Sequence, residues 1–135
     1  MQQSNHVKFI NPDTMASPGG YSTVVETRNV RTIYVSGQVA LDQEGQIIGT
    51  GDLAAQTTQV FENIRLALEA ADVSFNDVVK LTFFLTDISN MQVVRDIRDQ
   101  YINLKNPPAS SAVEVRRLIR DEFMLEIEAV AVAGI

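Results

Sequence analysis

Residues 77–87 read DVVKLTFFLTD, a run of β-branched, leucine and phenylalanine residues that predicts a β-strand. Side chains alternate along a strand, and here the apolar residues fall on both faces. One face carries Val79, Leu81, Phe83 and Leu85, and the other carries Val78, Thr82 and Phe84. We therefore expect a strand within a sheet that is at least partly covered on both sides.

The segments that flank this strand have the periodicity of helices. Residues 52–71 place apolar side chains at intervals of three or four, and Asp52 is suited to cap the first turn. A second helix is expected to begin near Ser89, because Ser89 and Gln92 have the spacing of a capping box. The Asn106-Pro107-Pro108 segment is expected to end it.

Five more segments read as strands. Residues 22–28 and 31–39 are rich in β-branched and aromatic residues, and the turn-like residues between them predict a hairpin. The other strands are expected at residues 46–48, 111–115 and 122–132. The predicted order, β-β-β-α-β-α-β-β, is that of a single α+β domain spanning residues 1–135.

The last strand predicts how the sheet is covered. Its apolar residues share one face: Phe123, Leu125, Ile127, Ala129 and Ala131. Two helices can cover only one face of a sheet, and the opposite face carries valine beside Glu126 and Glu128. Self-association is the simplest way to cover that second face.

Composition narrows the class of protein. The chain has 135 residues, 45% of them hydrophobic, and no cysteine, which excludes disulfides and thiolate catalysis. The polar N-terminus has no apolar signal region and no apolar run could span a bilayer, so we expect a soluble cytoplasmic protein without a membrane partner. The net charge of -6 and the absence of a basic stripe argue against nucleic-acid binding.

Few residues suggest chemistry on their own. No glycine-rich phosphate loop, zinc-binding HExxH or nucleophile elbow is present, and no metal site is expected. The single histidine, His6, lies in a polar stretch and is interpreted as an exposed tail residue.

Three short segments could line a ligand cleft. Ser36-Gly37 interrupts a strand, which marks either a close approach of a ligand or a simple strand end. The paired glycines before Tyr21 either present its phenol to a cleft or lead into the first strand. Glu126 and Glu128 share a strand face about 7 Å apart, so one of them in a cleft could direct a water, or both could be solvated edge charges.

Six segments in order resemble the Rid/YjgF family, over nearly the whole chain from residue 19. They are GGYS (19–22), YVSGQVALDQEG (34–45), QTTQVFENIRLALEAA (56–71), DVVKLTFFLTD (77–87), PPASSAVEV (107–115) and LEIEAVAV (125–132). The resemblance implies a chorismate-mutase-like subunit with two helices on one face of a mixed sheet. Three such subunits would form a homotrimer with a barrel-like core and clefts between neighbours.

The resemblance also implies an activity. Well-studied members hydrolyse reactive imines and enamines to a keto acid and ammonium without a cofactor. Tyr21, Ser36 and Gly37 match cleft positions of the family, and Glu128 is matched to the glutamate linked with water activation. Tyr21 and Glu128 are therefore the expected catalytic residues, while Ser36 and Gly37 are expected to bind substrate.

Three cleft positions depart from the family pattern. Ser110 stands where the family arginine grips the substrate carboxylate, and Ala112 stands where many relatives have cysteine. Losing such a charge-assisted pair costs about 1.5–3 kcal/mol, so the substrate is expected to differ from the usual amino-acid-derived imines. Arg95, where many relatives have asparagine, either binds an anionic ligand from a new direction or pairs on the surface with Asp99.

Two functions remain open at this point. One is a cofactor-free deaminase of imines, enamines or related conjugated amines, working in clefts between subunits. The other is a non-catalytic ligand-binding or regulatory trimer that has lost the chemistry together with the arginine.

Overall fold

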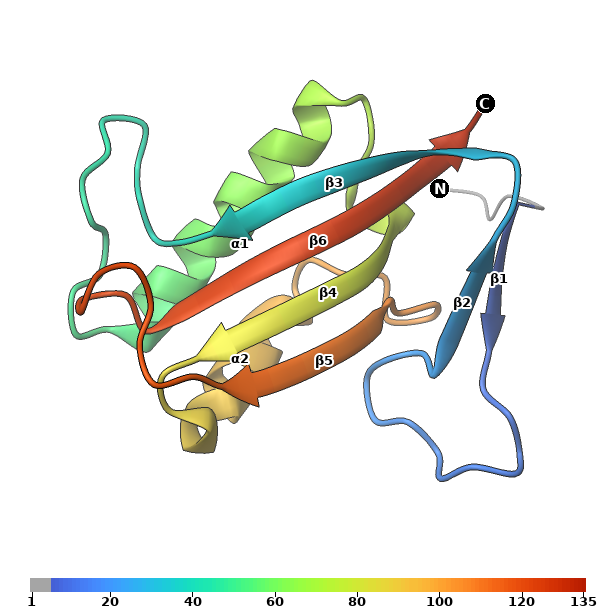
Figure 1. Ribbon diagram of the computed structural model, residues 1–135, viewed down its shortest axis with the longest axis horizontal. Coiled ribbons are helices and arrows are strands. Elements are labelled where there is room, and N and C mark those ends of the chain that lie inside the picture. Colours follow the sequence, from blue (N-terminus) through green and yellow to red (C-terminus); the bar gives the residue numbers. More distant parts are fainter. Residues whose placement is uncertain (1–5) are drawn as a thin grey trace.

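A four-stranded mixed sheet forms the centre of the computed structural model, which describes residues 6–135 (Figure 1). The strand order is β3-β6-β4-β5. The strands are β3 (Val30–Gln38), β6 (Leu125–Gly134), β4 (Val78–Leu85) and β5 (Ala109–Glu114). β6 runs antiparallel to both of its neighbours, whereas β4 and β5 are parallel. The α+β class and the mixed sheet are confirmed.

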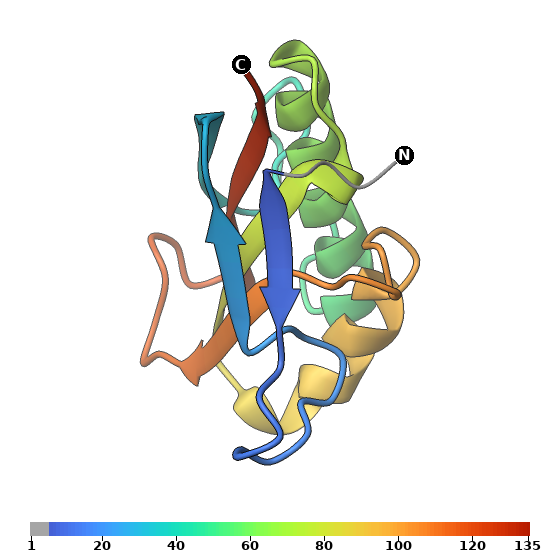
Figure 2. The same cartoon turned by 90° about the vertical axis from the view of Figure 1, so that its right-hand side faces the viewer.

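Both helices lie on one face of this sheet, as predicted (Figure 2). α1 (Leu53–Ala70) begins at Asp52, whose side chain accepts a hydrogen bond from the Ala55 backbone at 3.1 Å. α2 (Met91–Arg98) follows the 3₁₀ turn η2 (Ile88–Asn90). The expected cap from Ser89 is wrong, because Asp87 caps this turn and accepts from the Ser89 backbone at 3.1 Å.

The second helix is also shorter than expected. It ends at Arg98, and turns occupy the residues that lead to the proline pair. The Asn103 side chain accepts hydrogen bonds from the backbone of Lys105 at 3.0 Å and of Asn106 at 3.3 Å. These side-chain bonds satisfy backbone groups outside a helix, which explains why the helical pattern does not continue to Asn106.

The core lies between the sheet and the helices. The predicted apolar face of the last strand is confirmed, because Leu125, Ile127, Ala129 and Ala131 of β6 are buried, as is Phe123 just before the strand. Leu81, Phe83 and Leu85 of β4 are buried as predicted, but Val79 is not with them. The pairing of β4 with β6 shifts between Val78 and Lys80, and this bulge turns Val78 to the core in place of Val79.

The N-terminal part of the chain forms a separate hairpin. β1 (Val7–Ile10) pairs with β2 (Val24–Thr27), while β3 pairs with β6, so the predicted hairpin of residues 22–28 with 31–39 is wrong. Asn29 adopts a φ of 53°, and the chain turns there from one sheet to the other. The four-residue strand β1 went unrecognised because it is short and follows a polar stretch.

Two smaller predictions near these strands also fail. His6 is half-buried, and its Nδ1 lies 3.0 Å from the Arg28 carbonyl oxygen, so it is no tail residue. Residues 46–48 form no strand and contribute only a bridge between Leu41 and Ile47. The Asp42 side chain instead organises a turn there by accepting from the backbone of Glu44 at 2.9 Å and Gln46 at 2.8 Å.

The face of the sheet opposite the helices is open in the described part of the chain (Figure 2). Tyr34 of β3 is 79% exposed there, and its partner Val130 on β6 is half-buried. Glu128 is exposed beside Thr82 of β4. The chain therefore presents a broad surface that mixes apolar and carboxylate side chains.

Candidate functional site

One half of the candidate site lies where β3 meets β6. The register of this pair shifts between Val35 and Gln38, which makes a bulge of Ser36 and Gly37. A side chain at Gly37 would collide with the Glu126 carboxylate, so the absence of one lets Glu126 lie directly against the backbone. Ser36 is exposed beside it. A hydroxyl, a bulged backbone and a half-buried carboxylate thus come together at the sheet edge.

Glu128, the expected catalytic carboxylate, lies elsewhere on the same face. It is exposed and paired with Thr82, whereas Glu126 is half-buried and paired with Phe84. Sequence reasoning placed both glutamates on one face but missed that Glu126 is the one at Gly37. Which glutamate lies at Gly37 depends on the bulge at Ser36-Gly37, because the bulge sets the register of β3 with β6. Nothing in the sequence of β6 itself indicates this register.

Helix α1 anchors both segments that carry this half-site. Gln56 is fully buried; its amide nitrogen donates to the Glu122 carbonyl at 2.8 Å, and its oxygen accepts from the Met124 backbone at 2.9 Å. Asn63 donates to the carbonyls of Val39 at 3.2 Å and Leu41 at 2.9 Å. These bonds fix the chain just before Glu126 and just after Gly37.

The second half of the candidate site surrounds the start of β5. The Ser22 hydroxyl donates to the Pro107 carbonyl at 2.5 Å, and its backbone nitrogen donates to the Pro108 carbonyl at 3.1 Å. Ser22 also forms a parallel bridge with Ala109. Tyr21, 40% exposed, is thereby held next to the strand that carries Ser110.

A buried arginine at the end of α2 borders this second half. Arg98 is 7% exposed, and its Nε and one terminal nitrogen lie 3.0 and 2.9 Å from the Asp99 carboxylate. That terminal nitrogen would lie 2.8 Å from a Cβ at Gly20, which has a φ of +81°. Glycine is therefore required there both for its conformation and for room beside the guanidinium.

Arg95 lies one turn earlier on the exposed side of α2. Its guanidinium donates to the Gln92 side chain at 3.4 Å. Asp99, the alternative partner considered for Arg95, pairs with Arg98. Arg95 thus retains donor groups for a ligand.

The two halves are apart within one chain. In the pairing of β5 with β4, Ser110 lies opposite Leu81 and Ala112 lies opposite Phe83, so both residues belong to the helix side of the sheet. Glu128 instead lies opposite Thr82, which belongs to the open side. β3 and β5 are the two edges of the sheet, and three strand spacings separate them by about 14 Å. One chain does not bring Tyr21 and Ser110 to Gly37 and Glu126.

Within residues 6–135, no three histidine, aspartate or glutamate side chains are grouped so that they could hold a metal ion. None of the helices there is both long and apolar enough to cross a membrane.

The fold and the half-sites define a two-layer α+β protein with an open sheet face. The family model described as Endoribonuclease L-PSP matches residues 12–133. The chain is 40% identical over 113 residues to a RutC family protein of Pyrococcus abyssi, which covers 84% of this chain and 86% of that protein. It is 38% identical over 104 residues to the human 2-iminobutanoate/2-iminopropanoate deaminase, covering 77% and 74%. The chain therefore belongs to the Rid/YjgF family.

Solved structures agree with this assignment. A Rid-family protein of unknown function from Yersinia pestis superposes with a TM-score of 0.82 at 32% identity, covering 93% of this chain and 98% of that one. RidA from an Antarctic Psychrobacter gives a TM-score of 0.68 at 36% identity, covering 92% and 98%. The fold predicted from the sequence resemblance is thus confirmed for the subunit.

Proposed function

We propose that the protein hydrolyses imines or enamines without a cofactor, in clefts formed between copies of the chain. The observation that carries the proposal is the Glu126 carboxylate held against Gly37 on the open face of the sheet. A carboxylate at such a position can accept a proton from water. The similarity to the human deaminase supports the same reaction class.

In the proposed reaction Glu126 accepts a proton from a water molecule as the water oxygen bonds to the imine carbon. The imine nitrogen takes up this proton, which gives a carbinolamine. Glu126 then accepts the hydroxyl proton of the carbinolamine and passes it to the nitrogen, the carbonyl double bond forms, and the carbon–nitrogen bond breaks to release ammonia. An imine and one water thus give a carbonyl compound and ammonia. The backbone at Gly37 and the Ser36 hydroxyl are proposed to hold the substrate beside Glu126.

The second half-site is proposed to come from a neighbouring copy. Tyr21 would close the cleft, and Ser110 and Ala112 would line it without supplying a charge. A substrate carboxylate would then rely on another cation, and exposed Arg95 is our candidate. A trimer that associates through the open sheet faces would bring the second half-site of one copy to the first half-site of another. It would also bury Tyr34.

The proposal predicts different effects for the two neighbouring glutamates. Imines are generated in place from several amino acids, with and without a carboxylate, and release of the carbonyl product is followed. Glu126→Gln should lower the rate about 100-fold or more, since it removes the general base. Glu128→Gln, the matched control two residues away on the same face, should retain most of the activity.

Equal loss in both variants would contradict the assignment of the base to Glu126. If the wild-type protein accelerates none of the imines, the ligand-binding alternative is favoured. The specific observation behind that alternative is Ser110, which cannot replace the family arginine. Arg95→Ala, tested with carboxylate-bearing imines, separates a role in anion binding from a surface role.

A further inference from the structure

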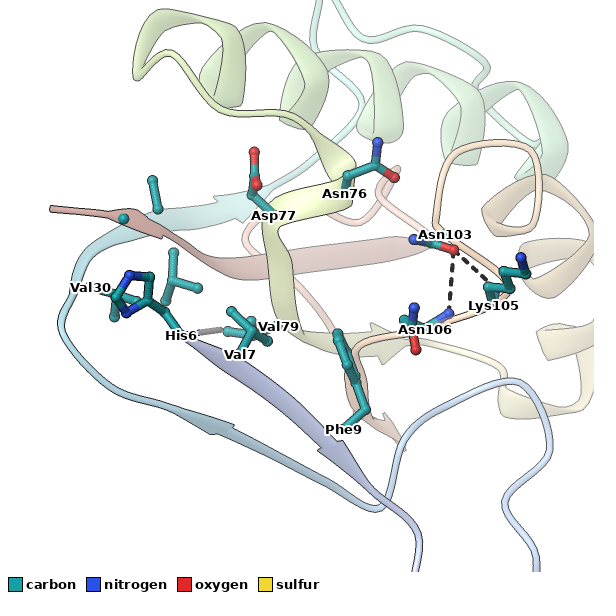
Figure 3. Close-up of a pocket in the computed structure, with 13 residues that line it drawn as sticks. His6, Val7, Phe9, Val30, Asn76, Asp77, Val79, Asn103, Lys105 and Asn106 are labelled. Carbon is teal, nitrogen blue, oxygen red and sulfur yellow. Dashed lines mark hydrogen bonds between the residues drawn. The ribbon is translucent and has the colours of Figure 1, made fainter. Parts of the chain in front are cut away.

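A pocket of about 170 Å³ lies away from both half-sites (Figure 3). It is bounded by the β1–β2 hairpin, the 3₁₀ turn η1 (Phe75–Asp77), the loop of residues 103–106 and the end of β6. Its volume is close to the about 150 Å³ of an engineered apolar cavity that holds benzene. The pocket is therefore large enough for a small ring or a branched aliphatic group.

The apolar wall of the pocket includes Val79, which the β-bulge turns out of the core. Val7 and Phe9 of β1 and Val132 of β6 lie on the same wall. Without the shift between Val78 and Lys80, alternation along β4 would direct Val79 to the buried face with Leu81. A bulge that breaks pairing in a central strand thus provides an apolar side chain to this pocket.

The polar wall presents an oriented amide. The Asn103 oxygen accepts from the backbone nitrogens of Lys105 at 3.0 Å and Asn106 at 3.3 Å, which fixes the orientation of the side chain. The amide nitrogen is consequently directed to the other side, toward the pocket (Figure 3). Asn76 and Asn106 also line the pocket.

Charge on the lining is balanced. The lining has one acidic residue, Asp77, and one basic residue, Lys105, while His6 is counted as neutral. The Asp77 carboxylate accepts from the Ser74 backbone at 2.9 Å. One charge of each sign gives an anion or a cation no net preference. Neutral amides, which both donate and accept, are the polar groups best matched to the three asparagines.

We propose that this pocket binds a small neutral carboxamide whose apolar body packs on Val79, Phe9 and Val132 and whose carbonyl oxygen accepts from the Asn103 amide. The site is independent of imine hydrolysis and shares no residue with the Gly37–Glu126 or Tyr21–Ser110 half-sites. A ligand of this size is expected to bind with a dissociation constant on the order of millimolar.

Benzamide is a direct probe of the pocket. Benzoate and toluene have a similar shape and serve as comparison ligands, because benzoate carries a negative charge and toluene has no polar group. In NMR titrations of the full-length protein, benzamide should shift the backbone signals of residues 103–106 and of β1. It should bind about tenfold more tightly than either comparison ligand, because only benzamide can form hydrogen bonds with the asparagine amides without bringing a charge into the pocket.

Two variants test the contacts separately. Asn103→Asp keeps the oxygen that the loop requires but removes the donor, and should weaken benzamide binding about tenfold. Val79→Phe should abolish binding by filling the pocket, with folding checked by the melting temperature. Gln46→Glu, a charge change of the same sign on an exposed turn, should leave binding unchanged.

Three results would overturn the proposal. One is the absence of binding to the wild-type protein at concentrations well above millimolar. Another is a set of shifts that maps outside the pocket. The third is equal affinity of the folded Asn103→Asp variant, or of toluene, since the oriented amide would then contribute nothing.

Discussion

At the scale of single residues, the candidate site depends on the absence of a side chain at Gly37. The sequence singled out Ser36-Gly37 and Tyr21 as cleft positions, and both segments lie where they could serve a cleft. It did not distinguish Glu126 from Glu128, because both follow the same alternation in β6. That choice depends on which residue of β3 opposes each glutamate, and a bulge changes this by one residue.

Gly37→Ala tests the close approach of Gly37 and Glu126. The new methyl group would displace the Glu126 carboxylate, the flexible end of a long side chain, so the fold should tolerate the change. We expect the rate of imine hydrolysis to fall at least tenfold while the free energy of unfolding changes by less than about 1 kcal/mol. Parallel measurements of rate and of urea denaturation check this.

A rate close to wild type in Gly37→Ala would show that Glu126 does not need its place against the backbone. Gly45→Ala is a useful comparison, because nothing lies within 4 Å of a Cβ at that turn position. Because Gly45 has a positive φ of 78°, we expect Gly45→Ala to lower the free energy of unfolding but to leave the rate of imine hydrolysis unchanged.

At the scale of elements, strong periodicity predicted α1, β4 and the buried face of β6. The failures included β1, which is four residues long, and the extent of α2, where Asn103 bonds the following loop. A bulge such as the one at Val79 is set by tertiary pairing and cannot be read from alternation. The strand β1, the loop at Asn103 and the bulge at Val79 all contribute residues to the lining of the pocket in Figure 3.

A stacked aromatic contact joins α1 to the turn after α2. The rings of Phe61 and Tyr101 lie 5.0 Å apart, and the Tyr101 hydroxyl donates to the Glu62 carboxylate at 2.8 Å. Burial, with the hydrogen bond to Glu62, raises the pKa of Tyr101 to about 12. The hydrogen bonds from Tyr101 and Arg65 lower the pKa of Glu62.

Tyr101→Phe should therefore be less stable than wild type at neutral pH, by about 1 kcal/mol. A raised pKa favours the protonated phenol in the folded state, so this advantage is complete below pH 10 and disappears between about pH 10 and 12. The difference in unfolding free energy between the two proteins should shrink over that range. A constant difference in urea denaturation from pH 8 to 12 would contradict the role of the phenol proton.

At the scale of the whole molecule, the sequence predicted correctly that two helices cover one face of the sheet. It also suggested that the second face is covered by other copies, which the proposal of a trimer retains. The separation of the two half-sites supports this proposal, because one chain does not bring them together. Such a separation could not be predicted from the sequence, because it depends on strand order and on the register of β5.

Tyr34→Glu tests the association through the sheet. Tyr34 is 79% exposed on the open face, so a carboxylate there should leave the subunit folded but destabilise any interface that buries it. We expect light scattering to show a shift from trimer to monomer. The rate of imine hydrolysis should fall in proportion to the loss of trimer. An unchanged oligomer, or a monomer with full activity, would contradict the arrangement.

Subunit complementation tests most directly that each active cleft takes one half from each of two copies. Glu126→Gln and Tyr21→Ala, each expected to be nearly inactive alone, are unfolded together, mixed in equal amounts and refolded. Random mixing should leave about a quarter of the clefts with both intact halves, and so restore about a quarter of the wild-type activity. If mass spectrometry shows mixed trimers and they remain as inactive as the separate variants, the two half-sites do not form one cleft.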